Sequence, residues 1–137
     1  MAVRALIIAY RKPGLTPDEF HTRYEAHAAL IKRLAGDTFP ISHRRTYIAR
    51  TTAHTPPEGA TQRNATTPAA MLRGTQADAD FDAIAELTFA DQASFERFAG
   101  RIQVPEIAAE LAADEEGFLE TQTVTIVMVG DVAETRG

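Results

Sequence analysis

Residues 16–36, which read TPDEFHTRYEAHAALIKRLAG, carry the signals of a complete helix. Thr16 can cap the amino end, Pro17 suits the first helical position, and Glu19 completes a capping box with Thr16. Gly36 suits the carboxyl end, because glycine tolerates the left-handed backbone that often follows a helix. The stretch therefore predicts a helix that begins at about Pro17 and ends just before Gly36.

One face of this predicted helix combines apolar side chains with a histidine. Phe20, Tyr24 and His27 are spaced i, i+4 and i+7, so they project within a sector of roughly 60°, and Ile31 continues the stripe. An imidazole on an apolar face changes its charge with small changes in environment, which suits acid–base chemistry. The alternative is a structural histidine bonded to a carbonyl group or to a carboxylate such as Glu86.

The stretches around this helix complete an alternating pattern. Apolar and β-branched residues predict strands at residues 3–10, 43–50, 81–89 and 121–129. Two shorter helices are expected before the last strand, from Asp91 to about Arg101 and from Val104 to near Gly117. The order β-α-β-β-α-β, with the second helical region split, predicts an α+β ferredoxin-like fold. In this fold a four-stranded antiparallel sheet carries its helices on one face.

The other face of the predicted sheet has no helices to cover it. Tyr10, Tyr47, Ile84 and the apolar residues of 121–129 can give that face an apolar character. A bare apolar face predicts a partner. The simplest partner is a second copy of the chain, in a two-fold homodimer whose sheets pack together.

Residues 1–130 are expected to form a single domain, and residues 131–137 a flexible tail. Within the domain, residues 51–77 are rich in Thr, Ala and Pro and show neither a helical nor a strand period. A loop of this length is unusual in a compact domain. It is therefore either a functional lid or a mobile segment.

Composition and missing motifs exclude several classes of function. Lys and Arg number 14 against 19 Asp and Glu, a net charge of −5, whereas nucleic-acid binding needs clustered positive charge. The absence of cysteine excludes disulfides and thiolate chemistry. No apolar run approaches the roughly 20 residues that span a bilayer, so we expect a cytoplasmic protein without a membrane partner. No metal-ligand spacing or nucleotide-binding motif occurs, and neither a metal nor a cofactor is expected.

Three motifs resemble those of the EthD-type dimeric α+β barrel proteins. They are the run Tyr10-Arg11-Lys12-Pro13-Gly14-Leu15-Thr16, the pattern Glu19-Phe20…Tyr24…His27, and the later Asp114-Glu115…Phe118-Leu119. The resemblance covers most of the chain, except residues 51–77 and the tail. It implies a dimeric barrel built from ferredoxin-like subunits.

A narrower set of motifs resembles the fungal branch of that family, which is found with aromatic polyketide pathways. The set comprises Gly36-Asp37…Phe39-Pro40…His43…Arg45…Tyr47-Ile48…Arg50 together with Phe81-Asp82-Ala83…Glu86. This resemblance implies a small cofactor-free decarboxylase or dehydratase that acts on polycyclic phenolic acids. Related barrels host cyclases, quinone-forming monooxygenases and haem proteins, so the fold does not fix the reaction.

His27, Tyr24 and His43 are the candidate catalytic residues. His27 can move a proton in decarboxylation or in dehydration, and Tyr24 or His43 can supply the second acid–base group. Tyr24 can instead fill the core with its hydroxyl at the rim. His43 can instead be an exposed histidine at the start of a strand.

The candidate substrate-binding residues are of three kinds. Arg45 can hold a carboxylate through two hydrogen bonds, and Glu86, near the middle of its strand, needs a partner of its own. His54 lies in the 51–77 loop and can close over a ligand or simply face solvent. The aromatic and apolar lining is expected from Phe20, Ile31, Tyr47 and Phe81, unless these side chains belong to the core.

These residues predict a cofactor-independent lyase that acts on an aromatic polyketide carboxylic acid, with decarboxylation ahead of dehydration. Two other enzyme activities are possible alternatives. One is a polyketide cyclase, and the other is an oxygenase that converts an anthrone into a quinone. An alternative outside the enzymes is a small-molecule binding module that shields a reactive intermediate.

Overall fold

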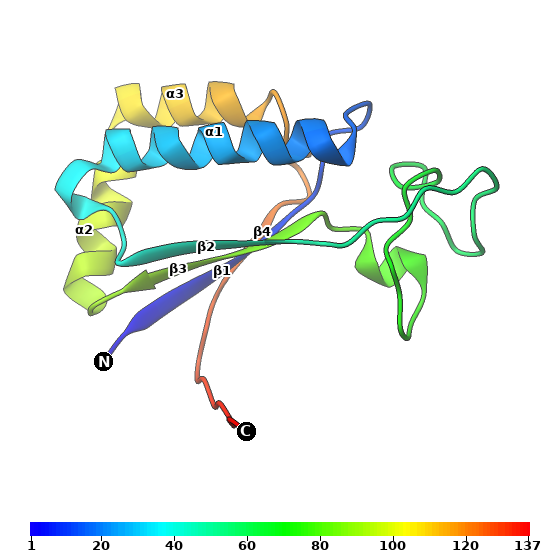
Figure 1. The fold of residues 1–137 in the computed structure, drawn as a ribbon. Helices are drawn as coiled ribbons and strands as arrows, with labels where there is room; N and C mark the ends of the chain where they lie inside the picture. Colours follow the sequence, from blue (N-terminus) through cyan, green and yellow to red (C-terminus); the bar gives the residue numbers. More distant parts are fainter.

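Three helices lie on one side of a four-stranded sheet in the computed structural model, which describes residues 1–137 (Figure 1). The elements are β1 (Val3–Ala9), α1 (Pro17–Ala35), β2 (Ser42–Tyr47), β3 (Ala83–Phe89), α2 (Gln92–Ile102), α3 (Pro105–Glu115) and β4 (Thr125–Met128). Two 3-10 turns cover Gly36–Thr38 and Gln76–Ala79. No helix is both long enough and apolar enough to cross a membrane.

The sheet has the order β2-β3-β1-β4. All three neighbouring pairs are antiparallel, and β1 pairs with both β3 and β4. This arrangement confirms the predicted α+β ferredoxin-like fold. It also makes β2 an edge strand, which runs below α1 (Figure 1).

The helix predicted from residues 16–36 is confirmed at both ends. The Thr16 hydroxyl accepts a hydrogen bond from the backbone N–H of Glu19 at 3.1 Å. The Glu19 carboxylate in turn accepts from the backbone N–H of Thr16 at 2.9 Å. Gly36 ends the helix with a φ of 59°, a conformation that favours glycine.

All four predicted strands are longer than the observed ones, the first by one residue because β1 ends at Ala9. β2 ends at Tyr47 rather than at residue 50, because Arg50 bridges to Ala69 in the long loop instead of pairing with β3. β3 begins at Ala83, because the Phe81 carbonyl accepts a hydrogen bond from the Arg50 side chain at 2.7 Å. β4 covers only Thr125–Met128, because a turn closed by the backbone N–H of Thr123 interrupts the predicted 121–129 strand.

Small residues on the sheet make room for aromatic rings on the helix. Ala9, Ala83 and Ala85 are fully buried on the helix-facing side of β1 and β3. Phe20 and Tyr24 of α1 pack over them in one core cluster. Tyr47 pairs with Ala83 across the strands and so lies on this covered side. The prediction that Tyr47 contributes to the bare face is therefore wrong.

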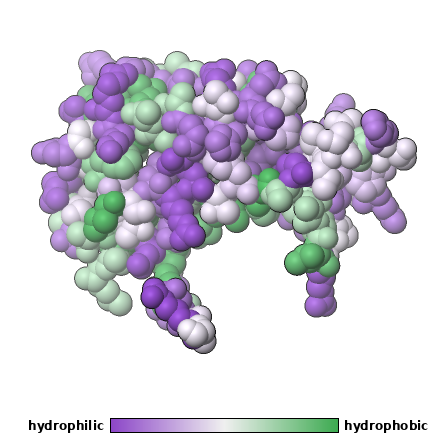
Figure 2. All heavy atoms as spheres, in the orientation of Figure 1, coloured by the Kyte–Doolittle hydropathy of each residue, from purple (hydrophilic) through white to green (hydrophobic).

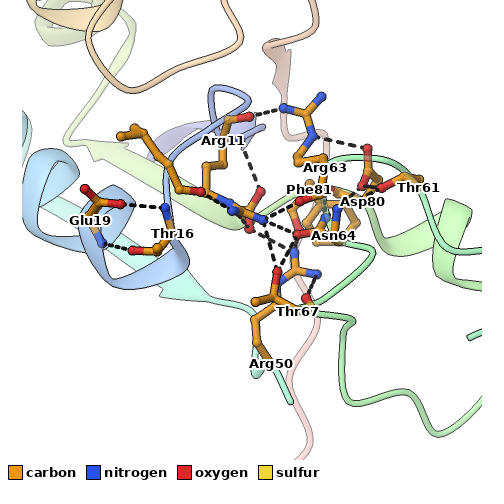
Figure 3. Close-up of polar contacts among 12 residues, drawn as sticks. Arg11, Thr16, Glu19, Arg50, Thr61, Arg63, Asn64, Thr67, Asp80 and Phe81 are labelled. Carbon is orange, nitrogen blue, oxygen red and sulfur yellow. Dashed lines mark hydrogen bonds and ion pairs between the residues drawn. The ribbon is translucent and has the colours of Figure 1, made fainter. Parts of the chain in front are cut away.

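Arg11 connects the chain before α1 to the 51–77 loop (Figure 3). Its Nε donates to Asp82 Oδ1 at 3.3 Å, and its Nη2 donates to Asn64 Oδ1. Arg50 Nη2 lies 3.0 Å from the same Asp82 oxygen. Arg11, Asn64 and Asp82 are only 3 to 4% exposed. Since buried charges need partners, this network fixes residues 61–67 of the loop beside the start of α1.

Candidate functional site

A groove of about 570 Å³ runs between α1 and the edge strand β2. Ala28, Ala29 and Lys32 form its helical wall. His43 and Arg45 form the strand wall, because they alternate with exposed residues along β2 and face the helix. The segment Phe39–Ile41 closes one end. The groove thus combines apolar surface with an imidazole and two cationic side chains.

His43 is the least satisfied polar group in this groove. Both of its ring nitrogens are buried, and neither has a hydrogen-bond partner. Burial, reinforced by the nearby charge of Arg45, lowers the pKa of His43 to about 4. The imidazole is therefore neutral at pH 7. Buried polar atoms without partners are uncommon in folded proteins and call for an explanation.

Arg45 and Tyr47 hold the carboxylate of Glu25. Arg45 donates to it twice, from Nε at 2.8 Å and from Nη2 at 2.9 Å. The Tyr47 hydroxyl donates to the same carboxylate at 2.6 Å. The hydrogen bond from Arg45 is the main reason that the pKa of Glu25 falls to about 2. Burial first, and then the bond to Glu25, raise the pKa of Tyr47.

His27 is buried behind this groove, at 4% exposure. Its Nδ1 lies 2.7 Å from Asp114 Oδ2, and its Nε2 lies 3.9 Å from Glu115 Oε2. Burial raises the pKa of Glu115. The carboxylates beside His27 therefore come from the end of α3. The alternative of a His27 bonded to a carboxylate is therefore confirmed, but the carboxylate is that of Asp114 and not that of Glu86.

Aromatic rings fill the space between the two histidines. The Tyr24 ring centroid lies 6.4 Å from that of His43 and 5.5 Å from that of Phe118. Phe118 in turn lies 5.1 Å from His27. Burial raises the pKa of Tyr24 to about 12, so its phenol stays protonated. His27 does not line the groove, and Tyr24 and Phe118 lie between it and His43.

The sequence profile of the EthD domain matches residues 12–122. The chain belongs to the EthD domain family. Solved structures share the fold at low sequence identity. An EthD family protein of Bacillus halodurans has a TM-score of 0.55 and 15% identity, with 95% of this chain and 99% of that chain covered. A protein of Arabidopsis thaliana has a TM-score of 0.54 and 15% identity, with 98% of this chain and 99% of that chain covered. No protein of curated function matches.

A third solved structure is the cofactor-independent oxygenase SnoaB of Streptomyces nogalater. It has a TM-score of 0.51 and 15% identity, and the match covers 97% of this chain and 95% of that chain. At this identity the likeness concerns the EthD fold and not the reaction.

The other predicted site residues of this EthD chain lie away from the groove. Phe20 is 1% exposed and packs in the core, although one edge borders a second, smaller groove. Ile31 packs against the second core cluster. Phe81 packs edge-on against Tyr10 at the end of the sheet, and His54 is exposed in the loop.

Glu86 lies on the sheet face opposite the helices. Its side chain is 36% exposed, and Oε1 lies 3.9 Å from Arg4 Nε. On this face Glu86 pairs across the strands with Leu6 and Arg44. The partner that a central carboxylate needs is thus a surface arginine.

Two residues of this EthD site were missed in the sequence. Asp114 was noted only within one of the motifs that resemble the family, and no role was assigned to it. Glu25 carried no signal, because the residues that bind it are 20 and 22 positions away in the chain. No group of three or more His, Cys, Asp or Glu side chains is placed to hold a metal ion.

A polar cleft of about 660 Å³ lies elsewhere, between residues 11–17 and the 51–77 loop. Only one of its lining residues is hydrophobic. The Arg11 guanidinium at its base donates to Asp82, Leu15 and Asn64. Because these donors are already bound within the protein, the cleft has fewer free polar groups for binding a ligand than the α1–β2 groove has.

Proposed function

We propose that this EthD protein is a cofactor-independent lyase acting on an aromatic polyketide carboxylic acid, with decarboxylation ahead of dehydration. The observation that carries the proposal is the neutral, unpartnered imidazole of His43 in a groove shared with Arg45. The motifs that resemble the fungal branch of the family supply the substrate class.

Decarboxylation of an o-hydroxy aromatic acid needs a group that moves one proton. After a rotation of its ring brings a nitrogen to the groove, a neutral His43 accepts the phenol proton and delivers it to the ring carbon that bears the carboxylate. The resulting keto acid loses CO₂, the carbon–carbon electron pair returns to the ring, and a phenolate remains. Solvent then protonates the phenolate. The sum is an acid converted into CO₂ and a phenol, with no oxidant or reductant.

Dehydration of a β-hydroxy ketone makes a different demand on the same side chains. A base must take the proton from the α-carbon while an acid protonates the departing hydroxyl. His43 suits the base, and Tyr24, whose ring lies 6.4 Å from it, is the nearby phenol. In this scheme His27, bonded to Asp114, supports the aromatic wall behind Tyr24.

Release of CO₂ from a phenolic polyketide acid tests the lyase proposal. The purified protein, treated with a chelator and given no nucleotide, should release CO₂ in proportion to enzyme concentration. His43→Gln should lose this activity, whereas Arg33→Gln, which changes an exposed side chain that pairs with Glu110 of α3 and does not line the groove, should keep it. Tight binding of the acid without turnover by the wild type would overturn the lyase and favour the binding module.

A second candidate is a cofactor-free oxygenase of the anthrone type. The fold likeness to the oxygenase SnoaB supports it, and the neutral His43 can equally deprotonate an acidic anthrone. Oxygen uptake recorded with an electrode during turnover separates the two. One O₂ consumed per product, without CO₂, would replace the lyase with the oxygenase.

A homodimer is part of the proposal, because the sheet face opposite the helices is open. Leu6, Ile8 and Ile84 project from this face with partial exposure, and Val127 is 43% exposed. In Figure 2 this face is seen from its edge, and hydrophobic residues show in green at the lower margin of the molecule between hydrophilic ones. Packing of two such faces would remove this apolar surface from water.

A further inference from the structure

Glu25 occupies a position built for a carboxylate. Arg45 presents two donors in the fork geometry that matches a carboxylate, and Tyr47 adds a third. Arg45 and Tyr47 lie two residues apart on β2, so their side chains share the helix-facing side of the strand. All three donors therefore come from one rigid element, whereas the acceptor reaches across from α1.

The donors keep their orientation through contacts that do not involve Glu25. Arg45 Nη1 donates to the His43 carbonyl at 3.0 Å, which fixes the guanidinium from behind. The Tyr47 ring stacks against the His21 ring with centroids 4.1 Å apart. Removal of the Glu25 carboxylate would thus leave a preformed three-donor site.

Glu25 itself is placed to leave this site. Its side chain is 40% exposed, compared with 21% for Arg45. A rotation about its side-chain bonds carries the carboxylate into water, where its solvation replaces the lost hydrogen bonds. Such side-chain rotations are fast compared with turnover. The exchange of one carboxylate for another leaves the charge at Arg45 balanced.

The site also adjoins the groove that contains His43. Glu25 and Arg45 form one end of that groove, and the apolar surface of Ala28, Ala29 and Phe39 extends from them. A carboxylate bound at Arg45 would place an attached aromatic ring on this surface, beside the imidazole. A second groove of about 230 Å³, bordered by Phe20, His21 and Tyr47, lies on the other side of the Glu25 contact.

We propose that Arg45 and Tyr47 bind the carboxylate of an o-hydroxy aromatic acid, and that Glu25 is an internal carboxylate that this ligand displaces. The inference rests on the proposed function only for the choice of an aromatic acid as the ligand. Under this proposal Glu25 weakens binding of the ligand, so its removal should strengthen binding. Removal of a substrate-binding residue would instead weaken binding, and removal of a purely structural ion pair would not strengthen it.

Fluorescence titration with 1-hydroxy-2-naphthoate tests the displacement. Glu25→Ala should lower the Kd by about tenfold, the scale of one hydrogen bond to a charged group. Tyr47→Phe and Arg45→Lys, each added to Glu25→Ala, should reverse the gain. 2-Naphthol, which has no carboxylate, should bind wild type and Glu25→Ala equally.

A matched control separates this effect from a general change in charge. Glu110→Ala removes the exposed glutamate that pairs with Arg33 at 3.3 Å, with the same change in net charge, and should leave the Kd unchanged. If Glu25→Ala does not fold, Glu25→Gln keeps the side-chain shape and should lower the Kd by a smaller factor. An unchanged or higher Kd in a folded Glu25 variant would overturn the proposal.

Turnover measured on the same proteins distinguishes this inference from the proposed function. Tighter binding in Glu25→Ala without CO₂ release by any protein would support the carboxylate site and overturn the lyase. CO₂ release by the wild type without tighter binding in Glu25→Ala would support the lyase and overturn displacement.

Discussion

The Nδ1 atom of His27 lies 2.7 Å from Oδ2 of Asp114, a residue 87 positions later in the chain. The contact joins α1 to the last turn of α3, and these helices lie side by side over the sheet (Figure 1). A carboxylate on one ring nitrogen fixes the orientation and the tautomer of an imidazole. The pair therefore makes His27 an oriented group rather than a mobile one.

Asp114→Asn is expected to lower turnover by about tenfold and to leave the thermal midpoint within a few degrees. The Asp114 side chain is 32% exposed, so an amide can replace the carboxylate without a large burial cost. His27→Ala should lower turnover further, because the ring that supports Phe118 and Tyr24 behind the groove is lost. Steady-state rates with thermal unfolding curves test both variants. Unchanged rates in Asp114→Asn, with unfolding of His27→Ala, would show that the histidine is structural.

His43→Leu is expected to lower kcat by about 10² to 10⁴, the usual contribution of a general acid–base group. Stability should stay the same or rise, because the substitution removes two buried nitrogens that have no partner. Steady-state kinetics and urea unfolding provide the two measurements. A full loss of activity that accompanies a large loss of stability would argue against a catalytic role.

The low pKa of His43 predicts a pH dependence of stability. The pKa is about 4 in the folded protein, below its ordinary value of 6.5. Between these values the unfolded chain binds a proton that the folded protein does not. The free energy of unfolding therefore falls as the pH drops from about 6.5 to about 4.

Urea unfolding at pH 7.5 and pH 4.5 measures this effect. His43→Leu should lose less stability between the two pH values than the wild type does. Equal losses in both proteins would show that His43 does not titrate in this range. The low pKa of Glu25, about 2 against an ordinary value of 4.5, acts mainly below pH 4.5 and acts equally in both proteins.

Local signals explain why the helical part of the fold was predictable. The capping box of Thr16 and Glu19 and the glycine at position 36 act within a few residues, so they fix both ends of α1 in any context. The end of β2 depends instead on Arg50, whose side chain bonds to Phe81 and Asp82 far along the chain. Such contacts have no local signal, and the strand was overextended.

The same distinction applies to the candidate site. The helical period placed His27 on the buried face of α1, and its burial is confirmed. Its partner could not be predicted, because the contact depends on how α3 packs against α1. His43 was predicted as a candidate catalytic residue and belongs to a motif that resembles the fungal branch. Its lack of partners follows from the tertiary packing around it.

Asp82→Asn is expected to destabilise the protein by about 3 to 5 kcal/mol, the usual effect of breaking a buried ion pair. Asp82 Oδ1 faces both Arg11 and Arg50, and the side chains of all three residues are at most 8% exposed. The substitution leaves both guanidinium groups without their anion. Urea unfolding measures the change, and Arg33→Ala, at an exposed ion pair, should cost no more than about 1 kcal/mol. Similar losses in both variants would contradict the structural role of the network.

Ile84→Lys is expected to convert a homodimer into monomers. Ile84 pairs across the strands with Ile8 and Thr46 on the open face of the sheet, so a charge there would be buried in the interface. Size-exclusion chromatography with light scattering reports the mass. Ile41→Lys, at a side chain that is 70% exposed outside the sheet, is the matched control and should stay dimeric. A wild type that is monomeric at micromolar concentration would show that the open face serves another purpose.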